Sequence, residues 1–140
     1  MEKAEDINGS VFIDYRNDFD DRKILIYGHN ARYLETVPFH ELEKFTDEYF
    51  LKENNSIELE LNGGKSTWKI FSVMITKDKK KHMKIEFDDL EWEEQLLWLK
   101  NESLYDTKVD INKSDRIIML QTCYYDPADS YLLISAKKVS

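Results

Sequence analysis

The stretch IIMLQTC at residues 117–123 is the most informative part of this sequence. Its first four residues are all apolar, as expected of a strand buried within a sheet. We predict one strand over residues 116–122 and another over residues 131–136, with a turn around Asp126-Pro127 between them. Cys123 therefore closes a buried strand beside a polar loop, where a thiol is better placed for reaction than in a strand centre.

A second strand of the buried type lies near the start of the chain. Residues 23–27 (KILIY) form a nearly continuous apolar run, which Gly28 ends directly before His29. A thiol needs a base or a cationic neighbour to supply thiolate near pH 7, and histidine is the usual provider. His29 and Cys123 are thus a candidate reactive pair, although 94 positions separate them. A lone cysteine is more often a small inert hydrophobe, and that alternative stays open at this point.

Strands dominate the remaining pattern, with two helical segments. Residues 11–14 form a short strand, and residues 56–61 and 67–76 form a hairpin around Asn62-Gly63-Gly64. One helix is predicted from Pro38 to Lys52. Another follows Asp88, with Glu91 three residues later in the pattern of a capping box, and it directs Trp92, Leu96 and Leu99 to the core. The class is therefore mostly β, an antiparallel barrel or sandwich with helical insertions.

Composition excludes several kinds of protein. A chain of 140 residues is one domain by length, and its net charge of −8 argues against nucleic acid as the main partner. No apolar stretch reaches the roughly 18 to 20 residues of a membrane span, so any anchor or export signal is expected outside this chain. One cysteine excludes an internal disulfide, and the scattered histidines show no spacing of metal ligands.

The remaining histidines have less obvious roles. The lysines at positions 77 and 79–81 form the only basic cluster, which we interpret as a solvated hairpin tip between two strands. His82 lies in this tip and His40 in the first predicted helix. Both side chains are expected to face solvent.

Five segments, taken in order, resemble class B sortases. They are GSVFIDYRND at residues 9–18, IYGHN at residues 26–30, KIFSV at residues 69–73, SLYDT at residues 103–107 and LQTC at residues 120–123. They are similar to the family's GSIFxDYRN, IYGHN, YKIFSV, S-x-Y-D-T and TLxTC segments, although Met119 replaces the first residue of the last one. The resemblance implies one catalytic domain over residues 1–140, without the family's upstream anchor, N-terminal helices and first strands.

The resemblance also implies a fold and an activity. The fold would be a sortase-type β-barrel, incomplete at its N-terminus, with a helix between the hairpin and the cysteine strand. The activity would be that of a cysteine transpeptidase needing no cofactor. In that reaction Cys123 attacks the backbone carbonyl after threonine in an NPxTN-like sorting signal, His29 serves as acid and base, and a peptidoglycan or pilin amine resolves the thioacyl enzyme. Gln121, Thr122 and Asn30 would contact the peptide.

The place of action follows from the same resemblance. A full-length form would work at the extracellular face of the membrane of a Gram-positive bacterium. The absent first strands would leave an open barrel edge, from which we expect self-association.

One residue departs from the family pattern. The last strand of the family carries an arginine that binds substrate and stabilises the oxyanion, and Tyr131 stands at that position. A tyrosine hydroxyl donates one hydrogen bond but brings no charge, and loss of one oxyanion donor typically costs about 10²- to 10³-fold in rate. Arg32, Lys137 and Lys138 are candidate substitutes, whereas Arg116 lies at the far end of the cysteine strand.

Three hypotheses of function follow. The first is an active transpeptidase. The alternative is a degenerate sortase homologue, catalytically impaired, that binds a peptide or a partner without turnover. The third is an interaction domain with an inert cysteine.

Overall fold

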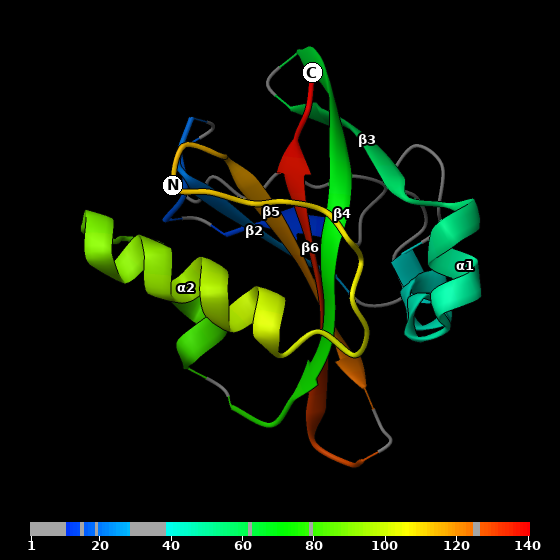
Figure 1. Ribbon diagram of the computed structural model, residues 1–140. Coiled ribbons are helices and arrows are strands. Elements are labelled where there is room, and N and C mark those ends of the chain that lie inside the picture. The colour runs from blue at the N-terminus through cyan, green and yellow to red at the C-terminus, as the bar shows by residue number, and fades with distance from the viewer. Residues whose placement is uncertain are drawn as a thin grey trace.

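A computed structural model describes residues 11–14, 16–18, 20–28, 39–61, 63–78, 80–124 and 127–140. In this part of the chain six strands form one sheet in the order β1-β2-β5-β6-β4-β3, with helices on both sides of it (Figure 1). The strands are β1 (Val11–Ile13), β2 (Lys23–Gly28), β3 (Ser56–Leu61), β4 (Gly64–Thr76), β5 (Ile117–Tyr124) and β6 (Ser130–Lys138). The helices are η1 (Phe39–Thr46), α1 (Glu48–Glu53), η2 (Lys81–Met83) and α2 (Asp89–Asn101), where η denotes a 3-10 helix. The expected class, mostly β with a helix between the hairpin and the cysteine strand, is confirmed.

The centre of the sheet consists of β5, β6 and β4. β6 runs antiparallel to both of its neighbours, whereas β2 runs parallel to β5 and places Tyr27 beside Gln121. Because parallel strands end at the same edge of a sheet, the carboxyl ends of β2 and β5 lie together. The first four residues of β5 are completely buried, as their unbroken apolar run predicted.

The sheet separates two buried layers. Phe45 of η1, Trp68 of β4 and Leu120 of β5 belong to the layer on the side of α1, which we call the α1-side face. Leu25 of β2 and Trp92 of α2 belong to the layer on the opposite side, which we call the α2-side face. Figure 1 shows α1 and α2 on opposite sides of the sheet. Side chains alternate along each strand, so each strand contributes to both layers.

The turn between β1 and β2 is held by polar side chains of the GSVFIDYRND segment. Asn17 accepts a hydrogen bond on Oδ1 from the Leu25 amide at 2.9 Å and donates through Nδ2 to the Lys23 carbonyl at 2.7 Å. Asp14 accepts from Arg16 and from the Tyr27 hydroxyl, and these bonds hold the pKa of its carboxyl below the ordinary value despite burial. These residues are therefore structural here.

The α2 helix begins and ends in fixed places. Asp88 and Glu91 form the predicted capping box, with reciprocal backbone bonds of 2.8 and 2.9 Å. At the other end, the Ser72 hydroxyl of β4 donates to the Leu99 carbonyl at 2.6 Å, and Thr107 donates to the Phe71 carbonyl at 2.8 Å. The helix is thereby held against the α2-side face, where Trp92, Leu96 and Leu99 are buried as predicted.

Two predictions about local structure are wrong. The single helix over residues 38–52 is a 3-10 helix followed by α1, because the Asp47 side chain accepts from the Tyr49 amide and starts a new helix there. The lysine cluster is not a hairpin tip between two strands. After Thr76 the described chain crosses the α2-side face with only the short η2 helix before α2, since Ile85 and Phe87 pack into that layer.

β1 and β3 are the outer strands of the described sheet. Self-association through an open edge stays a prediction. Among the described residues, the helices are all too short or too polar to cross a bilayer.

Candidate active site

Cys123 lies in β5, one residue before the strand ends, and its side chain is exposed. Alternation along β5 places Cys123 on the same face as Met119 and Gln121, which is the α2-side face. In the antiparallel register with β6, Cys123 stands directly opposite Tyr131. The side chains of directly opposed residues begin about 5 Å apart, so the thiol and the tyrosine are neighbours.

Gln121 and Tyr131 share a further partner, which is His82 of η2. The Nε2 atom of His82 lies 3.1 Å from Oε1 of Gln121. The imidazole also packs against the Tyr131 ring, with centroids 5.1 Å apart and planes at 50°. One histidine thus contacts both Gln121 and Tyr131, the two polar neighbours of Cys123 on this face among the described residues.

The expected exposure of His82 is wrong, since its relative exposure is 0%. The lysines beside it, Lys80 and Lys81, do face solvent, so the error concerns one side chain within the cluster. In a 3-10 turn, adjacent residues point in different directions, and the turn lays His82 onto the sheet. Sequence reasoning missed it because the segment around it has no apolar period that marks one residue as buried.

Burial sets the charge of His82. Removal from water and the nearby positive charge of Lys23 lower the pKa of His82 below its ordinary value, against weaker opposing effects of Gln121 and Asp78. The imidazole is therefore neutral at pH 7. With Nε2 donating to Gln121, the buried Nδ1 makes no well-formed hydrogen bond among the described residues, although the Asp78 backbone acts on the ring.

Lys23 of β2 lies beneath this cluster and is completely buried. Its Nζ donates to the His82 carbonyl at 2.6 Å and to Oε1 of Gln95 at 2.7 Å. Desolvation, with a smaller contribution from the charge of Arg16, lowers the pKa of Lys23 to about 7. The lysine therefore ties β2, η2 and α2 together through hydrogen bonds.

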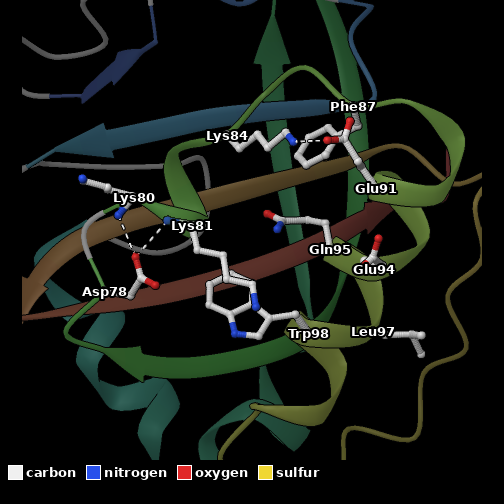
Figure 2. Close-up of a pocket in the computed structure, with 10 residues that line it drawn as sticks. All are labelled: Asp78, Lys80, Lys81, Lys84, Phe87, Glu91, Glu94, Gln95, Leu97 and Trp98. Carbon is white, nitrogen blue, oxygen red and sulfur yellow. Dashed lines mark hydrogen bonds and ion pairs between the residues drawn. The ribbon is translucent and has the colours of Figure 1, made fainter.

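A cleft of about 680 Å³ opens between α2 and the segment that carries η2 (Figure 2). Gln95 and Trp98 project toward it from α2, and Lys81 extends over Trp98 with Nζ 4.7 Å from the ring centroid. Lys84 and Glu91 form an ion pair of 2.6 Å at its rim. Gln95 joins this cleft to the buried Lys23.

Other predicted site residues lie apart from this cluster. Alternation directs the half-buried Thr122 to the α1-side face, away from the Cys123 side chain. Lys137 donates to the Asp110 carbonyl at 2.7 Å, and Arg116 contacts the Asp21 carbonyl at 3.2 Å. Lys137 and Lys138 end β6 and Arg116 precedes β5, so all three lie at the opposite end of the strands from Cys123 and Tyr131. Their distance along the strand is about 20 Å.

His29, Asn30 and Arg32 lie outside the described residues, and so does the side chain of His40. Within the described ranges, no group of three histidine, cysteine or carboxylate side chains is arranged to hold a metal ion.

Known proteins are similar to this chain in both sequence and fold. A model of the sortase domain family matches residues 2–139. Sortase B of Listeria monocytogenes is 34% identical over 118 residues, which cover 82% of this chain and 47% of that protein. Sortase B of Staphylococcus aureus is 26% identical over 142 residues, covering 98% and 57%. The chain thus spans about half the length of these curated relatives.

Solved structures give the same result. The X-ray structure of Clostridium perfringens sortase B has a TM-score of 0.83 and 34% identity, over 94% of this chain and 74% of that one. The Staphylococcus aureus sortase B–substrate complex has a TM-score of 0.80 and 26% identity, over 94% and 62%. Sequence, domain family and fold agree, and the chain belongs to the sortase family, within its class B.

Proposed function

We propose that this chain is the catalytic part of a cysteine transpeptidase, with Cys123 as nucleophile. The observation that carries the proposal is the position of Cys123. It is exposed at the end of β5, opposite Tyr131 and on one face with Gln121. A thiol at a strand end, flanked by polar side chains, is accessible to a peptide backbone.

The substrate is a C-terminal sorting signal of the NPxTN type. The Cys123 thiolate attacks the carbonyl carbon that follows threonine, the C–N bond breaks, and the new amine leaves with a proton from His29. An amino group of peptidoglycan or of a pilin then attacks the thioester and releases Cys123. His29 follows β2 in sequence, and the parallel pairing of β2 with β5 supports its place beside Cys123. Asn30 is assigned to peptide binding with it.

Tyr131 takes the position of the oxyanion donor. Its hydroxyl supplies one uncharged hydrogen bond where an arginine would supply a charged fork, so we expect a slow enzyme. We assign Gln121, which lies two residues before Cys123 on the same face of β5, to peptide binding. For Thr122 the role is confined to its backbone, because its side chain lies on the other face. The protein would act at the cell surface of a Gram-positive bacterium.

Turnover tests this proposal. A quenched fluorescent peptide with an NPxTN-type signal is incubated with the protein, with and without triglycine as amine acceptor. We expect slow cleavage, a transpeptidation product with triglycine, and neither with Cys123→Ala. Peptide binding without cleavage by the wild type would reject the proposal in favour of a non-catalytic homologue.

A further inference from the structure

His82 is a buried histidine that the proposed reaction does not use. It occupies no position in the five family segments, and it is neither exposed to substrate nor paired with a carboxylate in the described structure. Its Nδ1 makes no well-formed hydrogen bond in the described structure, so the burial of this imidazole is only partly compensated. A buried polar group of this kind calls for an explanation.

The contacts of His82 converge on the surroundings of Cys123. On one side its Nε2 meets the Gln121 amide oxygen, and its ring lies against the Tyr131 ring. Among the described residues, these two side chains flank the thiol on the α2-side face. On the other side its backbone carbonyl accepts from the buried Lys23, which also binds Gln95 of α2. His82 is therefore anchored to Lys23 through its backbone carbonyl, while its ring contacts Gln121 and Tyr131.

We propose that His82 is a positioning residue for the reaction at Cys123, which fixes Gln121 through a hydrogen bond and Tyr131 through ring packing. The inference rests on the proposed function. A lone tyrosine hydroxyl at an oxyanion site gains from being held in one orientation, since it has neither the charge nor the fork of an arginine. His82 supplies that restraint without touching substrate.

Two substitutions separate the two contacts. His82→Phe keeps a ring against Tyr131 but removes the donor to Gln121, whereas His82→Gln keeps a donor but removes the ring. The backbone carbonyl that binds Lys23 is retained in both variants. Lys77→Ala, at an exposed position of the same lysine cluster, is the matched control.

The measured quantity is the rate at which a sorting-signal peptide acylates Cys123, compared with the rate of alkylation by iodoacetamide. We expect each His82 variant to lower acylation about 10- to 100-fold, as misplacement of a binding group does, and to leave alkylation within about twofold. Alkylation needs no oxyanion donor. A merely structural role would lower both rates together.

Double variants assign each loss to its contact. The effect of His82→Phe should vanish in a Gln121→Ala background, and that of His82→Gln should vanish in a Tyr131→Phe background. Shifts of the Gln121 side-chain amide and Tyr131 ring signals in nuclear magnetic resonance spectra report the contacts without any activity. Acylation that is equal in wild type and His82 variants, or effects that simply add, would overturn the inference alone. A wild-type chain that no sorting-signal peptide acylates overturns the proposed function and, with it, this role.

Discussion

The two faces of the sheet differ in chemistry. The α1-side face holds an apolar cluster, in which Phe45 and Trp68 pack with the aliphatic side chains of the central strands and the half-buried Tyr105 and Tyr124 pack against them. The α2-side face has an apolar cluster of similar kind, but Lys23, His82 and Gln95 are buried within the same layer. Cys123 belongs to the second face. The α2-side face, on which the candidate site lies, therefore combines an apolar core with buried polar groups.

The largest expected effect lies in the apolar layer. Phe45→Ala removes a completely buried ring, and we expect it to lower the free energy of unfolding by about 3–5 kcal/mol. Urea denaturation measures this value. Tyr49→Ala in the adjacent α1, where the side chain is 70% exposed, is the control and should cost less than about 0.5 kcal/mol. Similar losses in both variants would contradict the assignment of this layer.

The contribution of the α2-side face to stability should depend on pH. Between pH 7 and 10.5 the unfolded state holds a proton on Lys23 that the folded state has released, so stability rises with pH across that window and the contribution is constant below pH 7. Denaturation at pH 7 and pH 10 should show a gain of a few kcal/mol that Lys23→Met lacks. Parallel pH profiles in the two proteins would show that Lys23 is charged in the fold.

The next effect concerns activity on the polar face. Tyr131→Arg restores a charged, forked donor opposite Cys123, and we expect acylation by the sorting-signal peptide to rise about 10²-fold. Mass spectrometry of samples quenched at successive times measures the rate. Tyr131→Lys, which adds a charge without the fork, should gain less. An unchanged or lower rate in the arginine variant would place the limiting step elsewhere.

The smallest effect tests how α2 is held over the polar face. Asp88→Ala removes one half of the capping box and should lower stability by about 1 kcal/mol. Thermal and urea denaturation measure it. Glu94→Ala, at an exposed position within the helix, is the matched control and should change stability by less than about 0.5 kcal/mol. A loss of stability in Asp88→Ala no larger than in Glu94→Ala would show that the capping box does not stabilise α2.

Local patterns predicted the strands well. The apolar run before Cys123, the alternation over residues 56–61 and the Asp88–Glu91 spacing each act within a few residues, so they can be identified from the sequence. The helix over residues 38–52 failed because Asp47 forms a cap inside an otherwise helical period. Helix propensity and hydrophobic period do not reveal a side chain that bonds to the backbone and starts a new helix.

The cluster formed by Lys23, His82 and Gln121 could not be predicted from local sequence patterns. His82 lies 59 residues from Lys23 and 39 from Gln121, and only the complete fold brings them together. The burial of Lys23 was likewise hidden, because a lysine at a strand end ordinarily extends to solvent. Cys123 and Tyr131 were predicted because a strand end and a family pattern mark them, and the register of β5 and β6 places the two residues opposite each other.

The most direct test of the account is the intact mass of the protein after brief incubation with an NPxTN-type peptide and acid quenching. We predict a mass increase equal to the peptide up to and including its threonine, less one water. The added mass is located on Cys123 by fragmentation, is released by hydroxylamine, and is absent from Cys123→Ala and strongly reduced in His29→Ala. A wild-type protein that gains no mass at any peptide concentration, although iodoacetamide still modifies Cys123, would contradict it.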